Sequence, residues 1–176
     1  MSNSTRSHYT FGDQGSAAER LRRLAALYRP VSAEALEEAV VEVGPPVHLA
    51  IDLGSGPDFT TELVAEVTQA RQVIGFERSA DFCSQARARV RTGIEFVEHD
   101  VSTDDLPCQN IDLAFCRFLL THLANPVVTL RRWREGSARG LQAAVASMQP
   151  DRRGRVAGRR CRVSRLASLN KEHTVI

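Results

Sequence analysis

Lysine is almost missing from this sequence, and long apolar runs and a secretory leader are missing altogether. Lys171 is the only lysine among the 176 residues. The chain therefore has no loop of the form Gly, four residues, Gly, Lys, Ser/Thr, which holds nucleotide phosphates. No stretch approaches the roughly 18 to 20 apolar residues that span a membrane, and the opening MSNSTRSHYT lacks the apolar segment of a secretory signal. We expect a cytoplasmic protein with no membrane-spanning segment.

Cysteines are few and show no pairing in their spacing. The four of them, Cys83, Cys108, Cys116 and Cys161, form no CxxC pair and no spacing typical of metal ligands. We therefore expect reduced thiols and no metal site.

Charge is distributed unevenly along the chain. Residues 1–130 contain 11 arginines and 18 acidic residues, a net charge of −7. Residues 131–176 contain 11 arginines, one lysine and three acidic residues, a net charge of +9, so the overall value of +2 conceals two different parts. The basic part suits an anionic partner, but no aromatic residue follows Trp133 on which bases would stack. The sequence therefore argues against nucleic acid as a partner.

The most informative stretch is 47–61, which reads VHLAIDLGSGPDFTT. An apolar run with β-branched residues leads into Gly54 and Gly56, and helical spacing follows, which predicts a strand, a tight turn and a helix. We expect such a turn to direct backbone N–H groups outward, toward a ligand at the carboxyl end of the strand. The dinucleotide pattern GxGxxG fits poorly, because its third glycine falls on Phe59. A turn that binds no ligand is the plainer alternative.

An acidic residue precedes this turn. Asp52, Gly54 and Gly56 resemble motif I of the class I S-adenosylmethionine (SAM)-dependent methyltransferases, which reads acidic-x-G-x-G-x-G. Asp58 replaces the third glycine, and we expect its side chain to narrow the approach to the methionine end of the cofactor. SAM carries an ammonium and a sulfonium and no phosphate, so a carboxylate suits it better than a lysine. The resemblance implies SAM as the cofactor.

Three further strand ends extend the resemblance, which covers about residues 9–133. Glu77 ends the second apolar run, where a carboxylate accepts hydrogen bonds from ribose hydroxyls; alone, it is better explained as a solvated strand end. Asp100 closes the third run, where the family binds the adenine amino group, and Val101 would pack on the ring. The cofactor-binding residues that the resemblance implies are Asp52, Gly54, Ser55, Gly56, Glu77, Arg78, Asp100, Val101 and Cys116.

The predicted fold class is α/β, a Rossmann-like, doubly wound and mostly parallel sheet. Strands over 47–53, 72–76, 94–101 and 111–116 recur at intervals of roughly 17 to 25 residues, as βαβ units require. Helices are predicted over 58–69 and 79–91, and again after the fourth strand, through Phe118 and Leu123 and then from Pro126. We divide the chain into a helical lid (residues 1–46), a SAM-binding core (47–135) and a basic tail (136–176).

The lid is predicted as two helices, the first from Ser16 to Pro30 and the second from Ser32 to Gly44. Two helices before motif I resemble the lid of many small-molecule methyltransferases, which covers the cofactor and shapes the acceptor pocket. Tyr9, Phe11 and Gln14 are then lid residues. A surface helix with an unstructured lead is an equal alternative.

The segment after the fourth strand bears on the acceptor. Cys116 to Leu119 stand where amino-methylating DNA enzymes have Asn/Asp-Pro-Pro-aromatic, so the resemblance implies a small-molecule acceptor. Arg117 is expected to line the pocket, where it orients an anionic acceptor or pairs with an acid. His122 is a candidate base, although a surface histidine is the plainer interpretation. Methyl transfer depends mainly on alignment, and we assign no catalytic residue.

The family pattern stops at about Glu135. The family has seven strands, but after Trp133 only Leu141–Met148 suggests a short element, and no period continues beyond Pro150. Three interpretations are open. The tail arises from a shifted reading frame or an early end of the gene, so that strands five to seven are incomplete; or it is a basic arm; or it folds as irregular sheet and completes the domain.

The function that the resemblance implies is methyl transfer from SAM to a small-molecule acceptor. One alternative is a noncatalytic remnant that binds SAM or nothing. Another is nucleic-acid binding through the basic tail. The oligomeric state is not predicted.

Overall fold

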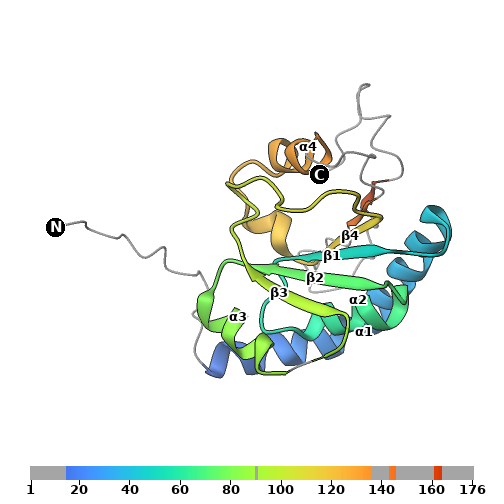
Figure 1. Ribbon diagram of the computed structural model, residues 1–176. Coiled ribbons are helices and arrows are strands. Elements are labelled where there is room, and N and C mark those ends of the chain that lie inside the picture. Colours follow the sequence, from blue (N-terminus) through green and yellow to red (C-terminus); the bar gives the residue numbers. More distant parts are fainter. Residues whose placement is uncertain (1–14, 90, 136–142, 146–160, 164–176) are drawn as a thin grey trace, which may run out of the picture.

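The computed structural model describes residues 15–89, 91–135, 143–145 and 161–163. They form a six-stranded sheet with the order β3-β2-β1-β4-β5-β6. Figure 1 shows helices on both sides of this sheet. The strands are β1 (Leu49–Leu53), β2 (Gln72–Glu77), β3 (Ile94–Glu98), β4 (Leu113–Cys116), β5 (Ala143–Val145) and β6 (Cys161–Val163).

The first five strands are parallel, and β6 is antiparallel to β5. The chain builds outward from β1 through β2 to β3 and then returns to place β4 on the other side of β1. Ligands of open α/β sheets bind at such a reversal of strand order, outside the carboxyl ends of the strands. The fold therefore directs attention to the residues that follow β1 and β4.

Helices cover both faces of the sheet because successive strand residues point to opposite sides. On one face, α1 (Gly15–Val43) and α2 (Phe59–Thr68) pack on Ala50, Leu113 and Phe115. On the other, α4 (Pro126–Glu135) places Trp133 against Ile51 and Leu53. Figure 1 shows α3 (Ala80–Arg87) on the side of α1 and α2. Ser79 caps α3 as expected, because its hydroxyl accepts a hydrogen bond from Phe82 N. The predicted Rossmann-like α/β architecture is confirmed.

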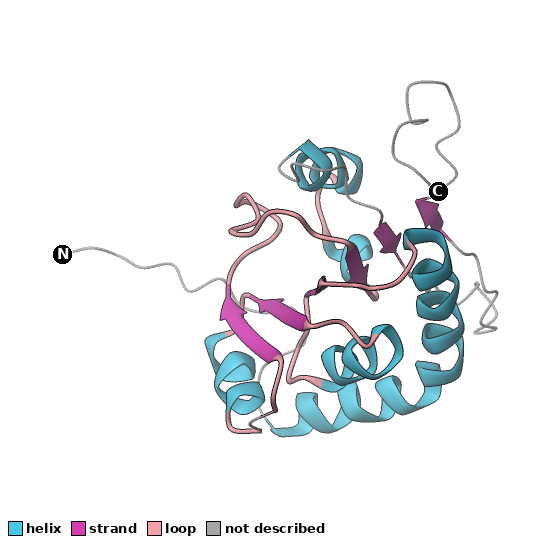
Figure 2. Cartoon of the chain, turned by 45° about the vertical axis from the view of Figure 1, so that its right-hand side comes forward, coloured by secondary structure: helices cyan, strands magenta, loops and turns pink. Residues whose placement is uncertain are grey.

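The prediction of two lid helices is wrong. A single helix, α1, continues through Pro30, and Figure 2 shows that it bends along its length. Proline removes one hydrogen bond and crowds the preceding turn, which bends a helix without always ending it. Both arms have tertiary contacts: Tyr28 meets Phe118 edge-on and Leu36 is fully buried in the core. Tyr9, Phe11 and Gln14 lie outside the described residues.

The α-helix predicted through Phe118 is also wrong. Phe118 has a φ of +63°, and a short 3-10 helix, η1 (Leu119–His122), follows it. A left-handed residue cannot continue an α-helix, so the chain leaves β4 through a tight turn. Beyond residue 135 the structure adds β5, which lies within the stretch 141–148 predicted as a short helix or strand, and β6, which the sequence pattern did not indicate. Two strands joined to the sheet favour the third interpretation of the tail for those residues.

No helix in the described part of the chain is both long enough and apolar enough to cross a membrane.

Candidate functional site

Asp52 has a buried carboxylate of which only one oxygen is hydrogen-bonded. It lies in β1 and is 1% exposed, on the face covered by α2. Its Oδ2 accepts hydrogen bonds from Thr60 Oγ1 at 2.6 Å and Thr61 Oγ1 at 2.8 Å, whereas Oδ1 is buried with no partner. Burial raises the pKa of Asp52 to about 6, although the two threonine hydroxyls act in the opposite direction. A buried carboxylate oxygen without a donor is costly and suits a cationic ligand.

The glycine turn directly follows Asp52. Gly54 and Gly56 have φ angles of +73° and +60°, which glycine adopts readily and other residues do not. The expectation that their N–H groups point outward is wrong. Gly54 N and Ser55 N both donate to Phe76 O, at 2.8 and 3.0 Å, and Gly56 N donates to Glu77 Oε2 at 2.9 Å. These three N–H groups are therefore hydrogen-bonded to residues of β2. The groups that remain to bind a ligand are side-chain acceptors.

Glu77 joins two loops at the carboxyl edge of the sheet. It ends β2 and is 3% exposed. One carboxylate oxygen accepts from Gly56 N, and the other accepts from Ser79 N at 2.8 Å. Burial raises its pKa, while these backbone hydrogen bonds favour the charged form. The charge of Glu77 raises the pKa of Asp52, and Glu77 accepts a hydrogen bond from the turn that follows Asp52, so the two predicted site residues lie at the same edge of the sheet.

Asp100 and Val101 lie two and three residues beyond the end of β3. Asp100 Oδ1 accepts from Ser102 N at 2.9 Å, which closes a tight turn. Val101 is buried beside Trp133, whose indole Nε1 donates to Val101 O at 2.9 Å. His99 N donates to Glu77 O at 2.9 Å, so this turn is tied to the end of β2. The sequence pattern gave no indication that Trp133 holds the turn.

The remaining predicted residues are placed as follows. Ser55 and Cys116 are buried, and Arg78 is exposed. Cys116 ends β4 in register with Leu53, so it lies beside the glycine turn. His122 is exposed on η1. The part of these residues in ligand binding stays a prediction.

Asp58, at the third glycine position, does not narrow the turn in the expected way. Its φ is +104°, and its fully buried carboxylate pairs with Arg89 Nη1 at 2.6 Å and Arg91 Nη1 at 3.1 Å. The side chain is therefore held by the segment that follows α3. Arg89 also lies over the ring of Phe59, 5.2 Å from its centroid. Two ion pairs thus support a backbone conformation that glycine would adopt more easily.

Side chains of two other elements approach the turn. A Cβ added to Gly54 would meet Leu119 Cδ1 at 3.3 Å, and one added to Gly56 would meet Leu21 Cδ1 at 3.8 Å. Leu119 belongs to η1 and Leu21 to α1. Side chains of α1 and η1 therefore both border the glycine turn.

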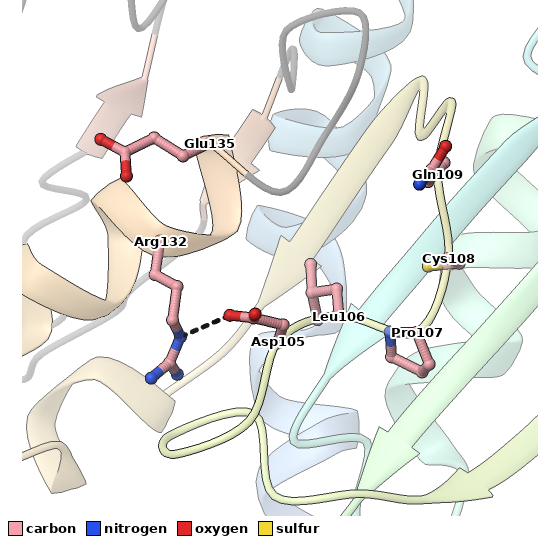
Figure 3. A pocket seen from close by; sticks show the side chains of 7 residues that line it. All are labelled: Asp105, Leu106, Pro107, Cys108, Gln109, Arg132 and Glu135. Atoms are coloured by element: carbon pink, nitrogen blue, oxygen red, sulfur yellow. Dashed lines mark ion pairs between the residues drawn. The ribbon is translucent and has the colours of Figure 1, made fainter.

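A hollow of about 730 Å³ lies elsewhere, between α4 and the loop before β4. Figure 3 shows Arg132 and Asp105 facing each other there, with Arg132 Nε 3.7 Å from Asp105 Oδ1. None of its lining residues belongs to the glycine turn or to the strand ends beside it. The lining residues are Asp105, Leu106, Pro107, Cys108, Gln109, Arg132 and Glu135.

The raised pKa of Asp52 predicts a pH-dependent stability. Between its ordinary value of 3.8 and about 6 the folded protein binds more protons than the unfolded chain, so this group lowers stability as pH rises through that window. Asp52→Asn removes the titration and keeps an oxygen acceptor for the threonine hydroxyls. We expect the stability of Asp52→Asn relative to wild type to increase by about 2–3 kcal/mol from pH 4 to pH 7. Urea unfolding of both proteins at four pH values measures this, and a constant difference contradicts it.

Comparison with known proteins identifies the domain. The methyltransferase domain family matches residues 51–136. Trans-aconitate 2-methyltransferase of Rhizobium rhizogenes is 34% identical over 102 residues, 58% of this chain and 38% of that protein. The enzyme of the same name from Afipia carboxidovorans is 30% identical over 100 residues, 57% of this chain and 38% of that protein.

The matched segment belongs to the class I SAM-dependent methyltransferases.

Solved structures agree on the fold of this methyltransferase domain. The plantazolicin methyltransferase BpumL, in complex with a monoazolic desmethylPZN analogue and S-adenosylhomocysteine (SAH), has a TM-score of 0.65 at 14% identity over 77% of this chain and 52% of that one. A methyltransferase of Methanococcus maripaludis gives 0.59 at 18% identity, over 84% of this chain and 68% of that one. The chain spans about two-fifths of the length of the curated relatives it matches.

Proposed function

We propose that this methyltransferase domain binds SAM at the carboxyl ends of β1 and β2 and transfers its methyl group to a small-molecule acceptor. The observation that carries the proposal is the buried Asp52 carboxylate, whose Oδ1 has no donor and which lies directly before the glycine turn. A ligand ammonium supplies the missing donor and the missing positive charge. The free lone pairs of Glu77 suit ribose hydroxyls, and Asp100 with Val101 suits the adenine.

The chemistry asks little of the protein beyond alignment. SAM supplies a methyl group on a sulfonium, whose S–C bond breaks as the acceptor forms its own bond to that carbon. The chain's residues hold the two partners in line and exclude water. An acceptor that is already an anion needs no general base, which agrees with the lack of an assigned catalytic residue.

The relatives suggest which acceptor to try first. Their name gives trans-aconitate as the methylated compound, and we propose a small carboxylic acid for this chain. We also propose a cytoplasmic location, because Cys83 and Cys108 form no disulfide among the described residues.

Calorimetric titration with SAM and with SAH tests the proposal. We expect both ligands to bind at one site per chain, and ATP to bind at neither this site nor another, because the turn offers no phosphate cradle. Circular dichroism on the same sample establishes that the protein is folded. A folded sample that releases no heat with either ligand would refute both SAM binding and methyl transfer.

A noncatalytic SAM-binding protein is the second candidate. It requires only a cofactor site at the carboxyl ends of β1 and β2 and no acceptor site. Transfer of radiolabelled methyl from SAM to trans-aconitate separates the two. SAM binding without labelled product for any carboxylic acid in a panel supports this candidate.

A further inference from the structure

Arg117 lies between α1 and the end of β4. It follows Cys116, the last residue of the strand, and is partly buried. Its Nη1 donates to Ser32 Oγ of α1 at 3.3 Å, and its guanidinium lies 5.7 Å from the centroid of the Phe118 ring. Phe118 in turn meets Tyr28 of α1 edge-on, with ring centroids 5.1 Å apart. The Arg117 guanidinium is thus in contact with α1 through Ser32 and lies near the Phe118 ring.

Asp52 acts on the charge of Arg117 through space but forms no ion pair with it. Among the described residues Arg117 makes no ion pair, and one long hydrogen bond to a hydroxyl uses one of its five N–H donors. Burial lowers its pKa, and the charge of Asp52, acting through space, opposes that shift. A cation withdrawn from water needs a hydrogen-bonded anion to offset its lost hydration.

Arg117 and Asp52 offer opposite charges to one region. Cys116 packs in the core on the α4 face of the sheet, and its neighbour Phe115 packs on the α1 and α2 face. Arg117 reaches Ser32 of α1, so it belongs to the face on which Asp52 lies. A ligand cation suits the orphaned Asp52 oxygen, and a ligand anion suits the guanidinium.

We propose that Arg117 binds a carboxylate of the acceptor and thereby selects small polycarboxylic acids. The proposal rests on the proposed function, because it concerns the acceptor of that reaction. A planar guanidinium fits a carboxylate through two parallel hydrogen bonds. The carboxylate of SAM is the competing anion, and the test below separates it from the acceptor.

The test measures binding to the SAH-loaded full chain by calorimetry. The probes are trans-aconitate, citrate and succinate, with the trimethyl ester of trans-aconitate as the uncharged control. The variants are Arg117→Gln, which removes the charge, and Arg117→Lys, which keeps the charge but not the fork. Arg71→Gln is the matched control, because Arg71 is an exposed arginine directly before β2, at the amino edge of the sheet.

The expected result is a selective loss. Arg117→Gln weakens binding of the best tricarboxylate about 10- to 100-fold, as expected for hydrogen bonds to a charged group, and leaves SAH affinity within about twofold. Arg117→Lys falls between Gln and wild type. Arg71→Gln behaves as wild type, and the ester does not bind to any of them.

Each other outcome overturns the inference in a recognisable way. Weaker SAH binding with unchanged acid binding assigns Arg117 to the cofactor. If Arg117→Gln weakens the binding of acid and SAH equally, or weakens neither, Arg117 has only a structural role. Wild type that binds SAH but none of the acids, or binds acid and ester alike, contradicts the inference alone. Wild type that binds no SAH removes the proposed function and this inference together.

Discussion

Replacing Trp133 with alanine is expected to lower the free energy of unfolding by about 3–5 kcal/mol. Trp133 is 1% exposed and is among the largest fully buried side chains of the described structure. Its removal leaves a cavity between α4 and the sheet, and truncations of buried tryptophan cost this much. Such a loss is a large share of the 5–15 kcal/mol that stabilises an ordinary domain. Denaturant unfolding followed by circular dichroism measures it.

Trp133→Phe is the matched control for this prediction. Phenylalanine keeps an aromatic ring in the core but loses the indole N–H that donates to Val101 O. Arg132 Nη2 still donates to the same carbonyl at 2.9 Å, so the acceptor is not stranded. We expect a loss of about 1 kcal/mol from the missing hydrogen bond and a smaller one from the ring. Equal losses for alanine and phenylalanine would show that packing is not the main contribution.

Asp52→Ala is expected to weaken SAH binding about 10- to 100-fold. The variant removes the carboxylate proposed to accept from the ligand ammonium, and charge-assisted hydrogen bonds contribute about 1.5–3 kcal/mol. The free protein should not lose stability in proportion, because alanine also removes a charge that is buried at a cost. Calorimetric titration of both proteins gives the ratio of dissociation constants.

Asp112→Ala provides the matched control. Asp112 is partly buried, whereas Asp52 is fully buried, and Asp112 Oδ2 likewise accepts two hydrogen bonds, from His48 N at 2.7 Å and Leu49 N at 3.0 Å. These residues are at the start of β1, so Asp112 is at the opposite edge of the sheet from the glycine turn. The Asp112→Ala variant should be less stable than wild type and keep the affinity of wild type for SAH. Unaltered affinity in Asp52→Ala, or an equal loss in Asp112→Ala, removes Asp52 from the binding site.

Local pattern was enough to predict the elements around the glycine turn. Apolar runs predicted β1, β2 and β4, and an alternating run predicted β3, all within a few residues of their observed bounds, and Ser79 marked the start of α3. Asp52 and Glu77 meet because parallel strands bring their carboxyl ends to one edge, which follows from topology alone. These features depend on periodicity and chain direction, and both can be read from a sequence.

Features that depend on distant partners were missed. The pairing of Asp58 with Arg89 and Arg91 spans more than 30 positions, and so does the hydrogen bond from Trp133 to Val101. The sequence predicted that a helix ends at Pro30. Tertiary contacts on both arms of α1 outweigh the free-energy cost of a proline within the helix. The N–H groups of the turn were predicted to bind a ligand, because nothing in the local sequence shows that the end of β2 accepts their hydrogen bonds.

The carboxylate of Glu77 has a consequence for how a ligand would arrive. Glu77 accepts from Gly56 N in the loop after β1 and from Ser79 N in the loop after β2. A single side chain therefore joins these two loops before any ligand is present. The two loops are therefore already ordered in the free protein. Binding a nucleoside between them would cost little further backbone entropy, because that entropy is lost during folding.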